Sequence, residues 1–166
     1  MTIPSTYDDL IEKAAKLYFP EHDWRLFKAQ IWHESGFKPA AKSPVGAEGL
    51  AQFMLPTWLE WRGKAGFPTH DRKDPRASVF TGACYMKYQI SQWTSPRPAM
   101  DRYCLAAAAY NTGLGRLLES QRIARGAYPY SKIIEKLPQV SPDGYQETTN
   151  YVRRILKTYG ELVTGE

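Results

Sequence analysis

The chain has 166 residues, a length that suits one domain with a sizeable buried core. Its 22 lysines and arginines outnumber its 17 aspartates and glutamates, which gives a net charge of +5. That charge favours an anionic partner without choosing among nucleic acid, a membrane surface and an acidic cell-wall polymer. The basic residues are scattered rather than gathered in one run, which disfavours a nucleic-acid partner.

Several other classes of protein lack their usual signals. No apolar run reaches the roughly 20 residues that span a bilayer, so we expect no stable membrane insertion. The first ten residues, MTIPSTYDDL, show no basic segment followed by an apolar one, so we expect synthesis in the cytoplasm without a signal peptide. Cys84 and Cys104 do not make a disulfide framework, and both lie in apolar helical surroundings typical of free thiols. The three histidines show no metal-ligand spacing, so we expect no metal.

Helix start and stop signals predict a chain of helices. Ser5 and Thr6 resemble a cap for the first helix, Asp23 and Gly36 bound the second, and Asp74 precedes a proline at the start of a long helix. In chain order, the expected helices are one that ends near 18, one over 24–36, a short one over 49–54, one from about 57, one over 75–93, one from 101 to the Asn-Thr-Gly sequence at 111–113, one over 114–125, a short one after 129, and one that includes 148–162.

The last helix has the clearest pattern. Thr148, Val152, Ile155, Tyr159 and Leu162 recur at helical spacing and form one apolar stripe. The sequence has no convincing alternating strand, internal repeat or low-complexity linker. It therefore predicts a single, mainly α-helical domain.

Glu34 stands out because it lies on an apolar helix face. At 100° per residue, Phe27, Ile31 and Glu34 fall on one side of the second helix. A carboxyl group there loses water, which disfavours its charged form and keeps the proton that a general acid donates. From the helix alone, a structural glutamate paired with an arginine or lying at a helix end is about equally favoured.

Four blocks of sequence carry a family resemblance. ESGF at 34–37, SPVGAEGLAQFM at 43–54, LAAAAYNTGLGR at 105–116 and ETTNYVRRIL at 147–156 resemble, in this order, the motifs of soluble lytic transglycosylases, which are similar to goose-type lysozyme. The segment DPRASVFTGACYMKY at 74–88 is similar to a helix between those motifs. The resemblance covers about residues 24–159.

The resemblance implies a lysozyme-like single domain over residues 1–166, with a substrate cleft and little or no sheet, within an α+β superfamily. It implies cleavage of the β-1,4 bond between N-acetylmuramic acid and N-acetylglucosamine, with formation of 1,6-anhydromuramyl ends and no cofactor. Glu34 would be the single catalytic acid and base. The substrate-binding residues would be Ser43, Gln52, Met54, Tyr110, Asn111, Glu147 and Tyr151.

Five of these substrate-binding positions also have an ordinary structural interpretation. Ser43 before a proline is typical of a local turn, and Met54 and Tyr110 are typical core residues. Asn111 before a glycine is equally typical of a helix C-terminus. Glu147 is a carboxylate that the macrodipole favours near a helix start.

Two alternative functions remain open. The first is a hydrolytic muramidase of the goose-lysozyme type, which would need a second carboxylate such as Glu48, Asp71 or Asp74 across the sugar. For Glu48, a solvent-facing position is favoured because Lys42 is near in sequence. The second alternative is a non-catalytic peptidoglycan-binding or virion structural component, which an intact Glu34 disfavours.

The expected partner is the glycan strand of peptidoglycan, bound by a monomer. A small, basic chain of this kind resembles a phage endolysin or a virion-associated lysis enzyme. Such a protein would act on periplasmic peptidoglycan and be bacteriolytic, with its positive charge favouring adsorption to the anionic envelope.

Overall fold

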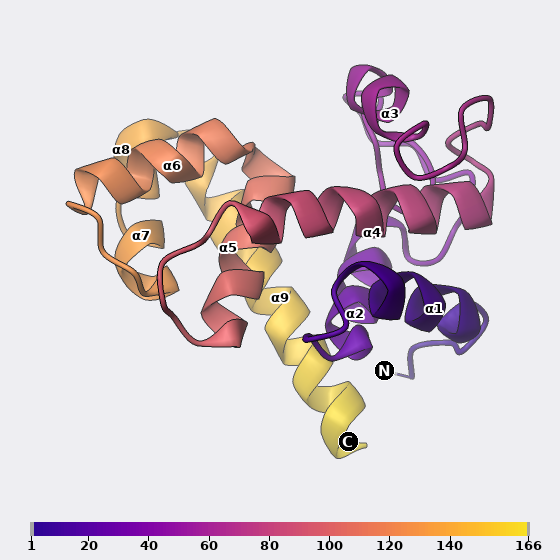
Figure 1. Ribbon diagram of the computed structural model, residues 1–166, viewed down its shortest axis with the longest axis horizontal. Helices are drawn as coiled ribbons and strands as arrows, with labels where there is room; N and C mark the ends of the chain where they lie inside the picture. Colours follow the sequence, from indigo (N-terminus) through magenta and orange to yellow (C-terminus); the bar gives the residue numbers. More distant parts are fainter. Residues whose placement is uncertain (1, 166) are drawn as a thin grey trace. The chain divides into compact units, whose positions relative to one another are not determined.

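Helices dominate the computed structural model, which describes residues 2–165 (Figure 1). Within this range the helices are α1 (Asp8–Tyr18), α2 (Trp24–Ser35), α3 (Leu55–Trp61), α4 (Pro75–Ser91), α5 (Ala99–Thr112), α6 (Leu114–Ile123), α7 (Tyr130–Ile134), α8 (Leu137–Val140) and α9 (Tyr145–Thr164). Extended pairing in the described residues is limited to two isolated antiparallel bridges, Lys42 with Glu48 and Glu48 with Phe53. The predicted mainly α-helical class is confirmed.

The chain divides into two compact units. The first consists of Met1–Lys87 and Thr158–Glu166, and the second of Tyr88–Lys157. Both boundaries fall inside helices, one near the end of α4 and the other within α9. The expectation of one catalytic domain over residues 1–166 stays a prediction.

In the first unit, α1 and α2 pack against each other through aromatic and aliphatic side chains. Phe19 and Phe27 are fully buried, and their rings meet edge to face with centroids 5.5 Å apart. The expected cap at Ser5 and Thr6 is wrong, because α1 begins at Asp8 with Tyr7 at the N-cap position and no side-chain cap. Instead, the Asp8 N–H, the first amide of α1, donates to the Ser5 carbonyl at 3.0 Å.

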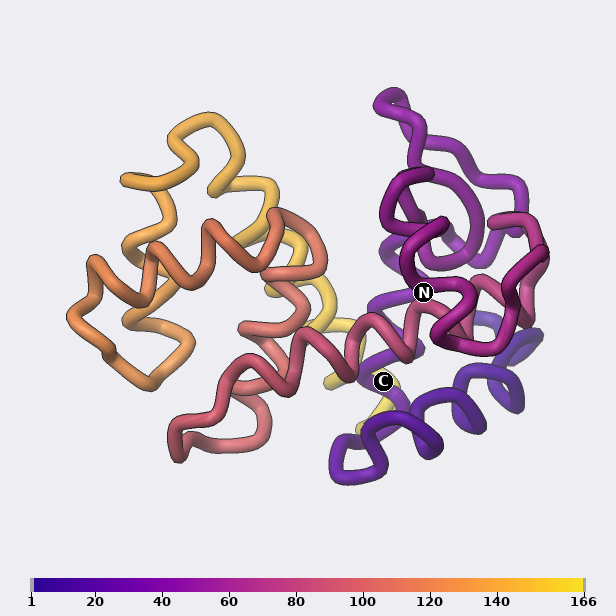
Figure 2. Tube along the Cα trace, turned by 45° about the horizontal axis from the view of Figure 1, so that its top comes forward, coloured from indigo at the N-terminus to yellow at the C-terminus, as the bar shows by residue number. Residues whose placement is uncertain are grey.

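The connection from α2 to α3 is irregular, as the Cα trace in Figure 2 shows. The short helix expected over 49–54 is wrong: these residues make turns that the bridge between Glu48 and Phe53 closes. Helix α3 starts at Leu55, two residues before the predicted Thr57, with a proline in its first turn. Asp74 caps α4 as predicted, accepting from Ala77 N–H at 2.7 Å.

In the second unit, α5 to α8 and most of α9 surround a separate core. Its fully buried side chains include Tyr103, Leu105, Leu117, Ile133 and Leu137. Helix α5 begins at Ala99 rather than at the predicted Asp101, and the Asp101 carboxylate instead accepts from Tyr130 N–H at 3.1 Å, at the start of α7. Helix α8 has no counterpart among the predicted helices.

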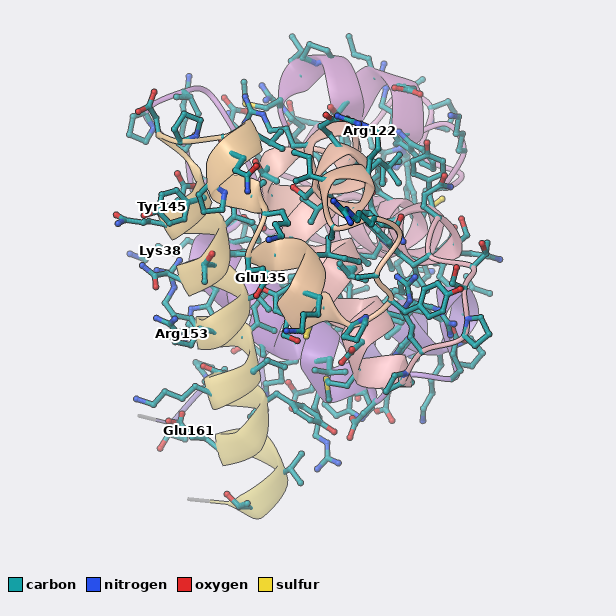
Figure 3. The ribbon with its side chains drawn as sticks, turned by 90° about the vertical axis from the view of Figure 1, so that its left-hand side faces the viewer. Lys38, Arg122, Glu135, Tyr145, Arg153 and Glu161 are labelled. Carbon is teal, nitrogen blue, oxygen red and sulfur yellow. The ribbon has the colours of Figure 1, made fainter. Side chains whose placement is uncertain are left out.

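Helix α9 has the predicted apolar stripe. Thr148, Val152 and Ile155 are 1%, 2% and 1% exposed. Arg153 (Figure 3) is exposed and donates to the Asn150 side-chain oxygen at 2.9 Å. No helix among residues 2–165 combines the length and the apolar character needed to cross a bilayer.

Candidate functional site

Helix α2 places Glu34 one residue before its C-terminal end. Phe27 and Ile31 on the same face are 0% and 1% exposed, whereas Glu34 is half-buried. The prediction that this acid lies on the buried face is therefore confirmed. A half-buried residue keeps part of its surface in contact with solvent, and an acid that transfers a proton to a ligand must be reachable.

The start of α2 is fixed by Asp23. Its Oδ1 accepts from Arg25 N–H at 3.0 Å as an N-cap, and its Oδ2 accepts from Arg25 Nη2 at 2.6 Å and from Tyr159 O–H at 3.2 Å. These bonds, the Arg25 side chain first among them, hold the pKa of Asp23 below its usual value. Further along α2, His33 Nε2 lies 2.8 Å from Thr158 Oγ1, a contact that joins α2 to the part of α9 in the first unit.

The chain turns sharply after Glu34. Gly36 and Phe37 both adopt left-handed backbone conformations, with φ of 58° and 59°. Gly36 does so without a Cβ cost. The Phe37 ring packs edge to face against the rings of Trp32 and Tyr7, with centroid distances of 5.3 Å and 5.6 Å. These contacts stabilise the strained backbone conformation of Phe37. The turn directs the following segment away from the helix axis immediately after the acid.

Ser43 makes a local turn. Its Oγ accepts from Ala47 N–H at 3.0 Å, its N–H donates to the Ala47 carbonyl at 2.9 Å, and its carbonyl accepts from Gly46 N–H at 3.0 Å. This is the ordinary structural interpretation of a serine before proline. The hydroxyl hydrogen is still able to donate to a ligand. A role for Ser43 in sugar binding stays a prediction.

Gln52 braces the loop that follows α2. Its Nε2 donates to the Ala41 carbonyl at 3.0 Å and to the Gly49 carbonyl at 2.9 Å. Two carbonyl partners fix the orientation of the amide. Both donors are therefore used within the protein, and Oε1 is the atom that a substrate could meet. The sequence predicted Gln52 as a substrate-binding residue and gave no sign of this bracing role, because Ala41 is eleven residues away.

Glu48 lies in an ion-paired cluster. Its side chain is 13% exposed, with Oε2 3.3 Å from Arg72 Nη2 and Oε1 3.4 Å from Lys42 Nζ. Arg72 Nη1 also donates to the carbonyls of Gly46 at 3.0 Å and Phe53 at 2.9 Å. The expectation of a solvent-facing Glu48 is wrong. Sequence reasoning did not single out Arg72, whose contacts all lie 19 or more residues away.

The other two carboxylates considered for a hydrolytic mechanism have local structural roles. Asp74 caps α4, as described above, and Asp71 Oδ1 accepts from Lys73 N–H at 2.7 Å in an exposed turn. With Glu48 in its ion pairs, each of the three is held by groups of the protein.

Met54 is exposed, in contrast to the core position typical of methionine. It is 42% exposed at the N-cap of α3, and Leu55 and Leu59 beside it are 49% and 53% exposed. The segment after Gln52 therefore presents apolar side chains to solvent. Such a surface is able to pack against the apolar face of a sugar ring, and this role for Met54 stays a prediction.

The remaining predicted residues lie in the second unit. Tyr110 and Asn111 are half-buried near the end of α5, and Asn111 Oδ1 accepts from Thr148 O–H on α9 at 2.8 Å. Glu147 is exposed in the first turn of α9, and Tyr151 is 3% exposed. The structure thus joins the Tyr-Asn motif of α5 to the start of α9, and the substrate contacts of these residues stay predictions.

Neither a metal centre nor a disulfide accompanies these residues. Within 2–165, no group of three or more His, Cys, Asp or Glu side chains is arranged to hold a metal ion. Cys84 and Cys104 are free thiols, and burial raises the pKa of Cys104 to about 12.

Solved structures of lytic transglycosylases share this fold. The soluble lytic transglycosylase Slt of Pseudomonas aeruginosa, solved as an inactive mutant, has a TM-score of 0.77 and 28% identity, covering 98% of this chain and 25% of that one. The 70 kDa soluble lytic transglycosylase of Escherichia coli has a TM-score of 0.74 and 27% identity, covering 99% of this chain and 25% of that one.

Curated relatives agree with the structural matches. Membrane-bound lytic murein transglycosylase F of Vibrio campbellii is 30% identical over 161 residues, which cover 88% of this chain and 29% of that protein. The protein of the same name from Vibrio cholerae is 29% identical over the same length and coverage. The chain thus spans less than a third of these relatives. The family model of the transglycosylase SLT domain matches residues 9–132. The chain therefore belongs to the transglycosylase SLT domain family.

Proposed function

We propose that the protein is a peptidoglycan lytic transglycosylase. The observation that carries this proposal is a half-buried Glu34 at the end of the buried face of α2, inside the segment that the family model matches. The lytic transglycosylases with the same fold and the lytic murein transglycosylases among the relatives support the same activity.

In the proposed mechanism one carboxyl group acts twice. Protonated Glu34 donates its proton to the glycosidic oxygen between N-acetylmuramic acid and N-acetylglucosamine, and the N-acetyl group of the muramyl sugar assists. The Glu34 carboxylate then takes the proton of that sugar's 6-hydroxyl as its oxygen bonds to the anomeric carbon. The product is a 1,6-anhydromuramyl end, and no water is consumed. Partial burial of Glu34 suits a proton shuttle that must exclude water.

The other residues predicted from the sequence would position the glycan. We propose that Ser43, Gln52 and Met54 in the first unit, and Tyr110, Asn111, Glu147 and Tyr151 in the second, contact the substrate. The exposure of Met54 and the available Oε1 of Gln52 support this assignment for the first unit.

The test is digestion of bacterial sacculi followed by mass analysis of the released muropeptides. We expect products lighter by one water than the reducing forms, and a loss of about 10²- to 10⁴-fold in their rate of release with Glu34→Gln. Glu60→Gln removes an exposed carboxylate on α3 and serves as the matched control, with the wild-type rate expected. Reducing-end products would identify a muramidase instead. Absence of products with wild-type protein would leave a non-catalytic wall-binding component.

The setting of this activity is part of the same proposal. We propose that the protein acts as a monomer on periplasmic peptidoglycan and is bacteriolytic. The net charge of +5 supports adsorption to an anionic envelope. A phage endolysin or virion-associated role rests on that charge, whereas the relatives named above are bacterial proteins. Lysis of cells by external addition, compared with expression together with a membrane-lesion protein, tests this setting.

A further inference from the structure

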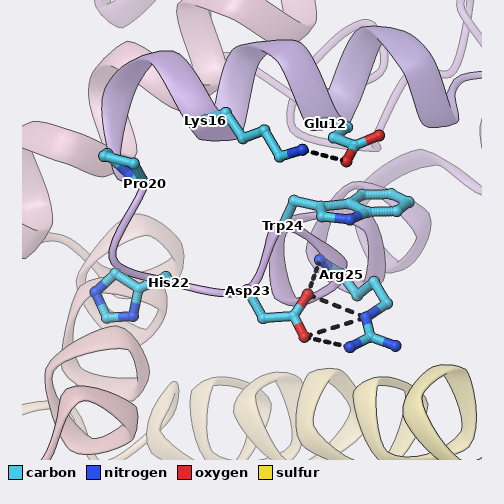
Figure 4. A pocket seen from close by; sticks show the side chains of 7 residues that line it. All are labelled: Glu12, Lys16, Pro20, His22, Asp23, Trp24 and Arg25. Carbon is cyan, nitrogen blue, oxygen red and sulfur yellow. Dashed lines mark hydrogen bonds and ion pairs between the residues drawn. The ribbon is translucent and has the colours of Figure 1, made fainter.

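A cavity lies in the first unit, between α1 and the start of α2 (Figure 4). It has a volume of about 450 Å³. The residues that line it come from α1, from the connection to α2 and from the first turn of α2: Glu12, Lys16, Pro20, His22, Asp23, Trp24 and Arg25. None of them belongs to the predicted catalytic or substrate-binding set.

This cavity is separate from the candidate catalytic acid. Trp24 is the first residue of α2, and Glu34 follows ten residues later near its other end. At 1.5 Å per residue, these positions are about 15 Å apart along the helix axis. A ligand in the cavity would therefore occupy a place of its own in the unit.

The charges that line the cavity are already paired. Lys16 Nζ lies 2.6 Å from Glu12 Oε1, and Arg25 Nη2 lies 2.6 Å from Asp23 Oδ2. An incoming carboxylate or ammonium group would meet a like charge beside each opposite one. A neutral polyol meets no such conflict, because its hydroxyl groups donate to the carboxylates and accept from the remaining N–H groups of lysine and arginine.

Apolar surface accompanies these polar groups. In Figure 4 the Trp24 indole is drawn between the Lys16–Glu12 pair and the Asp23–Arg25 pair, and Pro20 borders the same cavity. Trp24 is partly exposed, so the core does not enclose it completely. An aromatic ring flanked by a few placed polar groups is the usual composition of a small-molecule site. A pyranose ring, with C–H groups on its faces and hydroxyls at its edge, matches both parts.

We propose that this cavity is an accessory site for a neutral N-acetylhexosamine unit of a glycan strand, at which the protein holds its polymer away from the point of cleavage. The choice of glycan as ligand rests on the proposed function. The site itself rests on the cavity, the two internal ion pairs and Trp24.

The experiment measures hydrogen exchange of residues 12–25 by mass spectrometry in the Glu34→Gln protein, which removes cleavage from the readout. Chitotetraose is the neutral probe, and the isolated tripeptide stem of peptidoglycan is the charged one. We expect chitotetraose, and not the peptide, to slow exchange in this segment. The half-protecting concentration is the chitotetraose concentration that gives half of the maximal protection. Trp24→Ala is expected to raise it about tenfold, since an aromatic contact of this kind contributes roughly a factor of ten in affinity.

Leu17→Ala is the matched control, because Leu17 is 63% exposed on α1 and does not line the cavity. It should leave the half-protecting concentration unchanged. If Trp24→Ala fails to fold, Glu12→Ala combined with Lys16→Ala decides, since that pair is exposed and contributes little to stability. The double variant should also raise the half-protecting concentration.

Two results overturn the proposal. One is protection by chitotetraose that neither the Trp24 variant nor the double variant weakens, and the other is no protection, or protection by the peptide alone. Because cleavage is not measured, these results are independent of the sacculus digestion. Loss of anhydro products in that digestion would overturn the proposed function and leave the sugar-binding result standing.

Discussion

The buried ion pair between α1 and α2 should respond asymmetrically to loss of its two charges. Lys28 Nζ lies 2.7 Å from Asp8 Oδ1, and the side chains of Lys28 and Asp8 are 6% and 28% exposed. Asp8→Asn leaves an ammonium group that water hardly reaches. Lys28→Met leaves a carboxylate that is more than a quarter exposed and is still favoured by the N-terminal end of α1.

The magnitudes follow from this difference in exposure. Breaking a buried pair costs about 3–5 kcal/mol when the remaining charge stays buried. We expect a loss of about 3 kcal/mol in the free energy of unfolding for Asp8→Asn and about 1 kcal/mol for Lys28→Met. With a urea m-value of about 2 kcal/mol per M, the unfolding midpoint falls by about 1.5 M and about 0.5 M. Combining the two neutral substitutions should restore much of the loss, since no buried charge remains.

Urea unfolding followed by circular dichroism measures these midpoints. The matched control is Arg122→Gln, which breaks the pair of Arg122 with Glu119 at 2.6 Å on an exposed surface and should leave the midpoint unchanged. Equal shifts for Asp8→Asn and Lys28→Met would refute the reasoning from burial. So would a double variant that is less stable than Asp8→Asn alone.

Three further predictions concern the loop after Glu34 and the start of its helix. Gly49→Ala should lower the free energy of unfolding by about 3 kcal/mol. A Cβ at this position would lie 2.0 Å from the Arg72 carbonyl oxygen, and the φ of residue 49 is +88°, which strains any residue with a side chain. A thermal-shift assay measures the loss, and an unchanged melting temperature would contradict the prediction. Gln52→Glu replaces the two N–H donors of the amide with a carboxylate that faces the carbonyls of Ala41 and Gly49. The KM for sacculi should therefore rise, and the free energy of unfolding should fall by about 2 kcal/mol. An unchanged KM would count against the bracing role. Asp23→Asn keeps a cap but loses the charge that pairs with Arg25. Because the pKa of Asp23 is lowered by folding, its contribution is present above the unfolded pKa of about 4 and is lost as pH falls below it. The variant should therefore be less stable than wild type at pH 7, and the gap should close in denaturation series below about pH 4; a gap that persists at low pH would exclude this charge effect.

Capping residues, prolines and glycines predicted the ends of the helices where they occur. Asp23 and Gly36 set the limits of α2, and Asp74 caps α4, because a cap side chain, a proline or a glycine acts on atoms within a few residues. The apolar stripe of the last helix and the burial of Phe27 and Ile31 followed from periodicity alone.

The same local view placed Glu34 on its buried face, and the ordered motifs identified the family. Both depend only on residues close in sequence or on their order along the chain. The chemistry of a single half-buried acid is therefore already expected from the amino-acid sequence.

Only the tertiary structure decided the arrangement of residues 41–54. Arg72 reaches back to Glu48 and to the carbonyls of Gly46 and Phe53, and the Arg72 carbonyl approaches Gly49 so closely that only glycine fits. A propensity for a short helix cannot compete with contacts from a segment some twenty residues away, because the ion pair and the backbone bonds form only when the chain has folded. Gln52, which the sequence presented as a ligand to sugar, became the brace of the loop for the same reason.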